Sequence, residues 1–196
     1  MIQPIAGFRT SGLKRVESRP LASGADCERL VDDTENARAW PAAVASDGND
    51  QGFGRIDPDI RSGRQSPFDL SSPLGVDLVR RVEAINAEMF HFDVCGILAH
   101  DPPTINHYSA HSNDHFIRHA DVGDFAPFRK LTFSLQLSRS DDYMGGDLYF
   151  PELGLNAPRD QGTVTVFSSL LTHVVTPLIR GARMSVVGWI HGHQFR

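Results

Sequence analysis

The sequence predicts a mainly β fold, a jelly-roll sandwich supported by helices from the N-terminal part of the chain. Three observations lead to this prediction. The chain has 196 residues, which suits a single core. Helical periodicity is confined to residues 1–90, whereas short β-type runs separated by turns follow in residues 91–192. We therefore expect one domain over residues 1–196, in which residues 1–90 provide helical support and a lid segment and residues 91–192 form the β core.

Two stretches of the N-terminal part have helical character. One opens near Ser23 and carries Leu30 and Val31, and the other runs over Ser72–Phe90. The apolar positions of the second stretch recur at helical spacing: Leu78, Val79, Val82, Ile85 and Met89. Between the helices, Pro41–Ser71 is rich in Gly, Asp, Ser and Pro, and so long a loop in a compact domain is usually a functional lid or a disordered segment. We expect a lid.

The β-type runs are short and separated by turn residues. The eight expected strands are residues 92–98, 104–109, 115–121, 130–138, 147–152, 162–168, 172–178 and 183–192. The clearest is Leu131–Ser138, in which large apolar and small polar residues alternate strictly. This period of two excludes a helix and predicts a strand with one apolar and one polar face.

Composition and charge argue against several classes of protein. The net charge of −5, the pI near 5.9 and the absence of a Lys/Arg run predict no binding to nucleic acid or anionic membrane. No stretch approaches the length of about 18 apolar residues that a membrane span needs. Cys27 and Cys95 lack a CxxC partner, so we expect free thiols in a reducing cytoplasm. The oligomeric state is not indicated.

Metal-ligating residues occur in one of the expected strands. In His115–Asp121, His119 and Asp121 lie two residues apart, so both side chains project from the same face and can reach one cation. A His-x-Asp pair alone is weak evidence and needs a third ligand. His173 is the candidate, because it lies in a later β-type run at a position where core packing would favour an apolar side chain. Two His and one carboxylate make a facial triad that suits iron(II) and leaves positions open for a bidentate co-substrate and oxygen, with zinc as the competing metal.

A carboxylate-binding pair follows His173. Arg183 and Ser185 share one strand face by the same two-residue step. A guanidinium and a hydroxyl could hold the distal carboxylate of 2-oxoglutarate while its 2-oxo acid end chelates the metal. Taken alone, Arg183 is more often a surface or ion-paired arginine, and its combination with the triad favours the functional interpretation.

Four segments together resemble the prolyl-hydroxylase-like branch of the 2-oxoglutarate/iron(II) dioxygenases: His119-x-Asp121, Tyr143–Leu148, Gly162–Phe167 and His173–Arg183. The resemblance covers about residues 90 to 192. It implies a double-stranded β-helix in which His119, Asp121 and His173 bind iron(II) and Arg183 binds 2-oxoglutarate. Tyr108 matches a tyrosine that some members place against the co-substrate. It lies slightly further upstream of His119 than in the family pattern, and the turn before His119 lacks the glycine common there.

Further polar residues have two interpretations each. His115, Trp189 and His191 could line the site or be structural, and Asp147 could bracket a turn or point into the site. Arg61 and Arg64 could recognise an acidic group of the substrate, although solvated loop charges are the usual explanation.

The reaction expected from the resemblance uses iron(II), 2-oxoglutarate and O2 and releases succinate and CO2. Hydroxylation of a small amino-acid-like or natural-product substrate is favoured, since Asp121 fills the ligand position that related halogenases leave for chloride. Desaturation or ring closure stay open, and peptidyl proline is the alternative substrate. The alternative of another class is a non-catalytic metal-binding β-helix or cupin-like domain.

Overall fold

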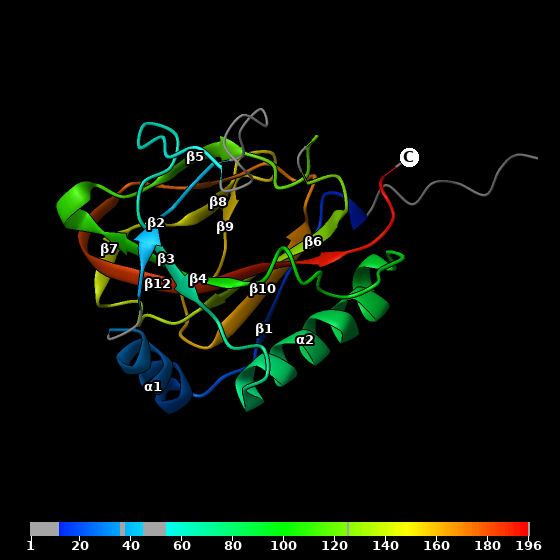
Figure 1. Ribbon diagram of the computed structural model, residues 1–196, viewed down its shortest axis with the longest axis horizontal. Coiled ribbons are helices and arrows are strands. Elements are labelled where there is room, and N and C mark those ends of the chain that lie inside the picture. Colours follow the sequence, from blue (N-terminus) through cyan, green and yellow to red (C-terminus); the bar gives the residue numbers. More distant parts are fainter. Residues whose placement is uncertain (1–11, 36–37, 45–53, 125, 196) are drawn as a thin grey trace, which may run out of the picture.

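Two antiparallel sheets face each other, and two helices cover the outer face of the larger one (Figure 1). The computed structural model describes residues 12–35, 38–44, 54–124 and 126–195. In the larger sheet the strand order is β1-β10-β6-β12-β4-β3-β2, with β7 also paired to β12, and in the smaller sheet it is β5-β11-β8-β9. The strands of the larger sheet are β1 (Val16–Pro20), β2 (Trp40–Pro41), β3 (Arg64–Pro67), β4 (Thr104–Ser109), β6 (Arg129–Gln136), β7 (Tyr143–Gly145), β10 (Thr163–Ser168) and β12 (Leu178–His191). Those of the smaller sheet are β5 (Phe116–His119), β8 (Leu148–Phe150), β9 (Leu155–Asn156) and β11 (His173–Val175).

Both expected helices form, and capping residues define where they begin. Before α1 (Gly24–Glu35), the Ser23 hydroxyl accepts from the Asp26 amide at 3.2 Å and the Asp26 carboxylate accepts from the Ser23 amide at 3.3 Å. Ser72 caps α2 (Pro73–Ile85) by accepting from the Gly75 amide at 3.1 Å. A π-helical turn, Asn86–Phe90, continues α2 and ends at His91, which has a φ of 58°. No helix in the described ranges is long and apolar enough to cross a bilayer.

The main core lies between the helices and the larger sheet. Leu131, Phe133 and Leu135 of β6 are fully buried against the helical layer. On the helix side they join Cys27, Leu78, Val82, Ile85 and Phe90. Gly188 of β12 belongs to this packing because a Cβ there would lie 2.6 Å from the Phe133 ring. The alternation predicted for residues 131–138 therefore separates a core face from a second face, which carries Thr132, Ser134 and Gln136.

Several expectations about the strands were wrong. Residues 92–98 form no strand beyond one bridge from Gly96 to His191, although Phe92, Val94 and Ile97 pack against the core. Their apolar residues are buried without forming a ladder. The lid segment 41–71 is not all loop, because Arg64–Pro67 forms β3 and pairs with β4. Strands β1, β2, β7 and β9 were also not predicted, since they are short and owe their pairing to neighbouring strands.

The two cysteines are free thiols, as expected. Cys27 is buried in the helical layer, whereas Cys95 is exposed. Burial raises the pKa of the Cys27 thiol to about 11, so this thiol is protonated at neutral pH and chemically inert.

Candidate metal centre and its cavity

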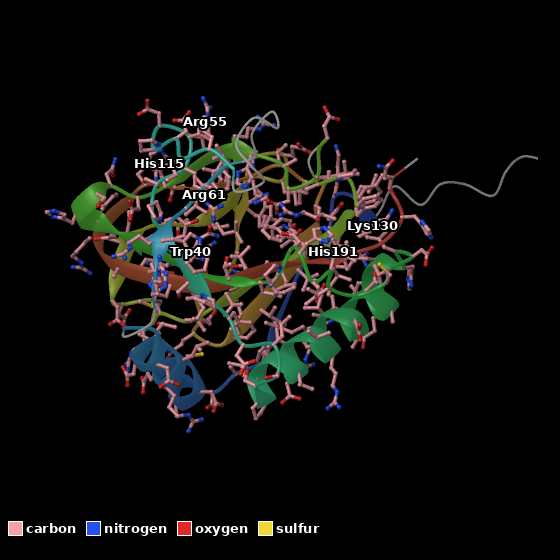
Figure 2. The ribbon with its side chains drawn as sticks, viewed as in Figure 1. Trp40, Arg55, Arg61, His115, Lys130 and His191 are labelled. Carbon is pink, nitrogen blue, oxygen red and sulfur yellow. The ribbon has the colours of Figure 1, made fainter. Side chains whose placement is uncertain are left out.

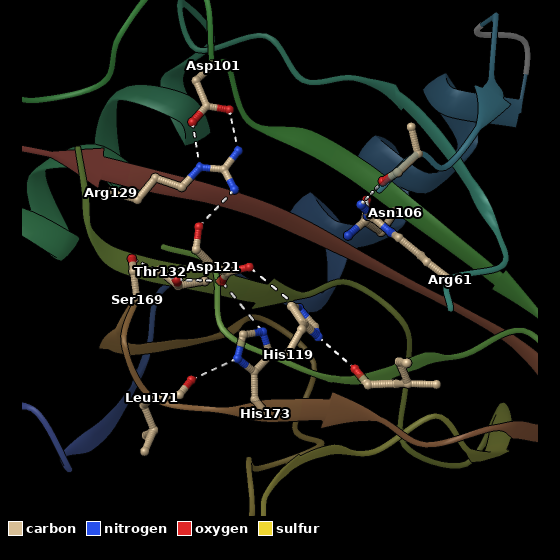
Figure 3. Close-up of polar contacts among 12 residues, drawn as sticks. Arg61, Asp101, Asn106, His119, Asp121, Arg129, Thr132, Ser169, Leu171 and His173 are labelled. Carbon is tan, nitrogen blue, oxygen red and sulfur yellow. Dashed lines mark hydrogen bonds and ion pairs between the residues drawn. The ribbon is translucent and has the colours of Figure 1, made fainter. Parts of the chain in front are cut away.

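His119, Asp121 and His173 converge between the two sheets (Figure 3). His119 ends β5, His173 begins β11, and the two residues lie opposite each other in the antiparallel pairing of these strands. One Asp121 carboxylate oxygen lies 3.5 Å from His119 Nε2, and the other lies 3.5 Å from His173 Nε2. Across the described residues this is the only group of three or more His, Cys, Asp or Glu side chains close enough to share a metal ion. The fold therefore brings together all three metal ligands that were predicted from the sequence.

Backbone carbonyl groups orient both imidazole rings. His119 Nδ1 lies 2.8 Å from the Ile117 carbonyl oxygen, and His173 Nδ1 lies 3.1 Å from the Leu171 carbonyl oxygen. A carbonyl accepts from an N–H, so in each neutral ring the proton is on Nδ1 and the lone pair of Nε2 is directed at the other ligands. Phe116 stacks on the His119 ring with 3.5 Å between ring centres. This arrangement favours a pair of rigid neutral nitrogen ligands.

Asp121 is positioned by a loop and not by β5, which ends at His119. The expectation that a strand continues to Asp121 was therefore wrong. The Asp121 amide donates to the Ser169 carbonyl at 3.0 Å, and the Asp121 carboxylate accepts from the Thr132 hydroxyl at 2.6 Å. The Thr132 hydroxyl also lies 3.1 Å from Ser169 Oγ. These contacts tie the carboxylate to the polar face of β6.

The electrostatics of the cluster suit a divalent cation. Burial alone would raise the pKa of Asp121, but the adjacent His173 and His119 and the Thr132 hydroxyl outweigh burial and hold that pKa far below its usual range. Burial lowers the pKa of His173 to about 4, against the opposing attraction of Asp121. At neutral pH the carboxylate is ionised and the His173 imidazole is neutral, which are the forms that bind metal.

A cavity of about 760 Å³ extends from these ligands along the polar face of the larger sheet. Alternate residues of the central part of β12 line it: Arg183, Ser185, Val187 and Trp189. Thr104, Asn106 and Tyr108 of β4 and Thr132 and Ser134 of β6 continue the same wall. The volume falls within the range of small-molecule sites.

One end of this wall carries unpaired hydrogen-bond donors. The Arg183 guanidinium is buried, and its Nε donates to Gln136 Oε1 at 3.1 Å, while its two terminal nitrogens have no hydrogen-bond partner among the described residues. The Ser185 hydroxyl is buried and also lacks a partner within the described ranges. Tyr108 lies opposite Arg183 in the pairing of β4 and β12, with its ring centre 5.9 Å from the guanidinium carbon. Buried donors without acceptors are costly, so this end suits an anionic ligand.

A partly buried ion-pair network supports the other end of the wall. Arg129 binds both carboxylate oxygens of Asp101, at 2.7 and 2.8 Å, and donates to the Asp121 carbonyl at 3.3 Å (Figure 3). His191 Nε2 lies 2.9 Å from Asp101. The Arg129 guanidinium lies over the Trp189 ring at 3.3 Å, and Trp189 Nε1 is buried with no partner among the described residues. Trp189 therefore lines the cavity, and His191 is an internal hydrogen-bonding residue.

The other polar candidates differ in position. His115 contacts the Asn113 carbonyl and the Ser62 hydroxyl and is not part of the metal cluster, which gives it a structural role. Asp147 lies 3.6 Å from Arg159, behind Arg183. Arg61 lines the cavity, whereas Arg64 is exposed and donates to the Ala39 carbonyl. Sequence reasoning missed Thr132 and Gln136, although both lie on the polar face of the predicted strand 130–138. It also missed the pair of Arg129 and Asp101, for which the sequence holds no local signal.

Part of the expected lid segment lies beside the cavity. Gly54, Arg55, Ile60 and Arg61 line it, and Figure 2 places Arg55 and Arg61 on the side of the molecule opposite the helices. Residues 45–53 of this segment lie outside the described residues. Closure of the segment over a bound substrate stays a prediction.

Part of the chain is similar in sequence to a family of known proteins. Residues 103–191 match the family model described as the 2OG-Fe(II) oxygenase superfamily, a stretch that holds the three candidate metal ligands, Arg183 and Ser185. A PKHD-type hydroxylase of Crocosphaera subtropica is 33% identical over 88 residues, which cover 43% of this chain and 37% of that protein. The chain thus matches little more than a third of that relative's length.

Solved structures resemble the chain over nearly its whole length. A prolyl-4-hydroxylase of Pseudomonas putida superposes with a TM-score of 0.65 and 17% identity, covering 94% of each chain. A prolyl hydroxylase from Trichoplax adhaerens, solved in complex with a peptide fragment of the hypoxia-inducible factor oxygen degradation domain, gives a TM-score of 0.67 at 16% identity, covering 93% of this chain and 84% of that one. The fold is therefore the double-stranded β-helix that the resemblance implied. Residues 103–191 are thus similar in sequence to the 2OG-Fe(II) oxygenase superfamily, and the fold of the chain is similar to that of solved prolyl hydroxylases.

Proposed function

We propose that this chain is an Fe(II)- and 2-oxoglutarate-dependent oxygenase that hydroxylates an unactivated C–H bond of a small amino-acid-like or natural-product substrate. The observation that carries the proposal is one cavity with two complementary features. It is lined by a cluster of two His and one Asp and also by a buried guanidinium with a buried hydroxyl. The first feature suits iron(II), and the second suits the distal carboxylate of 2-oxoglutarate.

In this proposal His119, Asp121 and His173 hold the metal, and Arg183, Ser185 and Tyr108 hold the co-substrate. When bound, iron(II) with 2-oxoglutarate and O2 would supply the oxidising chemistry, in which one oxygen atom enters the substrate C–H bond while 2-oxoglutarate becomes succinate and CO2. The residues of the chain contribute positioning. Gln136 fixes the Arg183 guanidinium through Nε, which directs its terminal nitrogens into the cavity, and Thr132 holds the Asp121 carboxylate.

The walls beyond the metal cluster leave room for a substrate. Trp189, Arg129 and Phe116 border this part of the cavity. Its rings and fixed polar groups resemble the lining of small-molecule sites. A peptidyl-proline substrate is the second candidate, and it is favoured by the likeness to a prolyl hydroxylase that was solved with a bound peptide.

The decisive experiment measures succinate formation and O2 consumption by the purified protein with iron(II), 2-oxoglutarate and ascorbate. Iron-dependent conversion of 2-oxoglutarate to succinate, accelerated by a substrate that gains one oxygen atom by mass spectrometry, is the expected result. Binding of 2-oxoglutarate should require the metal, because two of its donor atoms are proposed to chelate iron. The non-catalytic alternative is correct if neither turnover nor metal-dependent 2-oxoglutarate binding occurs.

A further inference from the structure

The Arg61 guanidinium faces the cavity from the segment before β3. Arg61 forms a backbone bridge with Phe116, and the flanking hydrogen bonds from the Ile117 amide to the Ile60 carbonyl and from the Ser62 amide to the His115 carbonyl fix the segment beside β5. Figure 3 shows the Arg61 side chain next to Asn106 of β4, and Arg61 is one of the residues that line the cavity. The arginine therefore belongs to the cavity wall and is not a solvated loop charge.

The guanidinium is held next to the metal cluster. Its central carbon lies 4.8 Å from the Phe116 ring centre, and Phe116 in turn stacks on the His119 ring. One terminal nitrogen donates to the Ala43 carbonyl at 3.0 Å and the other to Asn106 Oδ1 at 3.3 Å. These bonds use two of the five N–H groups that a guanidinium offers. The Nε atom is buried and lacks a partner among the described residues.

Among the residues that the structure describes, none provides a counter-ion for Arg61. The charged residues that line the cavity are Arg55, Arg61, Arg129, Arg183, Asp101 and Asp121. Asp101 pairs with Arg129, Asp121 belongs to the metal cluster, and Arg55 pairs with Asp57. Arg183 is assigned to 2-oxoglutarate in the proposed function. Within the described ranges no acidic side chain lies in ion-pair distance of Arg61, although a partly buried cation is normally paired.

We propose that Arg61 binds a carboxylate of the substrate, so that the substrate is a small carboxylic acid whose reacting carbon lies between Arg61 and the metal ligands. This inference rests on the proposed function and adds the chemical class of the substrate. A planar guanidinium with a buried unpaired Nε matches a carboxylate in charge and geometry. A proline inside a peptide chain carries no carboxylate at this point, and therefore the inference favours a free acid over a peptide.

The test compares acids with their amides. Succinate formation is measured with the twenty free L-amino acids, with the corresponding primary amides, and with the blocked peptide acetyl-Gly-Pro-Gly-amide. We expect at least one free acid to raise the rate above that without substrate, and its amide to have a kcat/KM at least about 10-fold lower. Arg61→Gln should lower kcat/KM for the acid by about 10- to 100-fold and for the amide by less than about 3-fold. Arg61→Lys, which keeps the charge, should retain part of the preference for the acid.

The ratio of acid to amide separates recognition from damage to the fold, because a distorted cavity lowers both rates. Arg64→Gln is the matched control, since Arg64 is an exposed arginine of the same segment whose side chain donates to the Ala39 carbonyl. It should keep the wild-type ratio. The inference is overturned if amides or the blocked peptide react as well as the acids, if Arg61→Gln keeps the wild-type ratio, or if no acid raises the rate while 2-oxoglutarate is consumed without substrate. Absence of any 2-oxoglutarate consumption or iron-dependent 2-oxoglutarate binding would instead contradict the proposed function.

Discussion

The two faces of the larger sheet are built from the same strands but have opposite chemical character. On β6, Leu131, Phe133 and Leu135 pack on the helices, while the intervening Thr132 and Ser134 face the cavity. On β12 the same alternation places Val186 and Ile190 in the core and Arg183 and Ser185 in the cavity wall.

Both faces are buried, so burial alone does not distinguish packing residues from functional ones. The apolar face stabilises the fold, whereas the polar face holds donors that have no partner among the described residues and that lower stability. In the proposed function a bound ligand supplies the acceptors that such donors lack. Substitutions on the two faces should therefore affect different measurements, and four variants test this separation.

The largest loss of activity is expected when a proposed metal ligand beside the polar face of the larger sheet is substituted. His119→Ala removes one of three proposed ligands, so iron affinity and turnover should fall together, with kcat/KM lower by at least about 1,000-fold. The thermal unfolding midpoint without metal should change little. His115→Ala is the matched control, since this histidine precedes the cluster in the chain but does not join it. Turnover that survives in purified His119→Ala with iron(II) would remove His119 from the ligand set.

Arg183→Gln tests the buried cation of the polar face. Loss of a desolvated charge pair should cost about 2–4 kcal/mol, so the KM for 2-oxoglutarate should rise by about 30- to 1,000-fold while iron binding changes far less. The KM for the monocarboxylate 2-oxobutyrate should differ only slightly between wild type and variant. Arg180→Gln, an exposed arginine on the same strand, serves as the control. An unchanged KM would show that Arg183 is not the co-substrate clamp.

The opposite face is tested by Leu135→Ala. Deleting a fully buried leucine from the helical core should lower the free energy of unfolding by about 3 kcal/mol, as measured by urea titration. The neighbouring Ser134→Ala, on the cavity face, should change it by less than about 1 kcal/mol. Equal losses for the two variants would contradict the assignment of stability to the apolar face.

The smallest and most discriminating effect concerns Ser185→Ala. The Ser185 hydroxyl is buried without a partner within the described ranges, so its removal should leave the free energy of unfolding unchanged or slightly higher. The KM for 2-oxoglutarate should nevertheless rise by about 5-fold, equivalent to about 1 kcal/mol. A destabilised variant with a normal KM would indicate that this hydroxyl serves packing only.

The parts of the molecule that could be predicted are those where neighbouring residues in the sequence carry the signal. The alternation in residues 131–138 and the pair Arg183 and Ser185 each follow from the two-residue repeat of a strand. The short spacing of His119 and Asp121 also indicated a shared site, although Asp121 lies beyond the end of β5. Serine and proline at the start of α2 likewise predict its beginning.

The remaining features depend on residues far apart in the chain. Nothing near Asp101 in the sequence indicates that it pairs with Arg129 and His191, and nothing near Gln136 indicates that it orients Arg183. The polar stretch Arg64–Pro67 becomes a strand because β4 offers it an edge, not because its own residues favour extended structure. Asp121 lies beyond the end of its strand because contacts to Ser169 and Thr132 determine its position.

The position of β12 has a consequence for how the protein is made. This strand follows all the others in the sequence, yet it lies in the middle of the larger sheet and pairs with β4, β6 and β7. While the ribosome is still synthesising the residues before Leu178, β4 and β6 each have an open edge that only β12 can cover, and such edges promote aggregation. Nascent chains of this protein should therefore depend on chaperones until β12 has left the exit tunnel, and Arg183 reaches its place only in the step that closes the sheet.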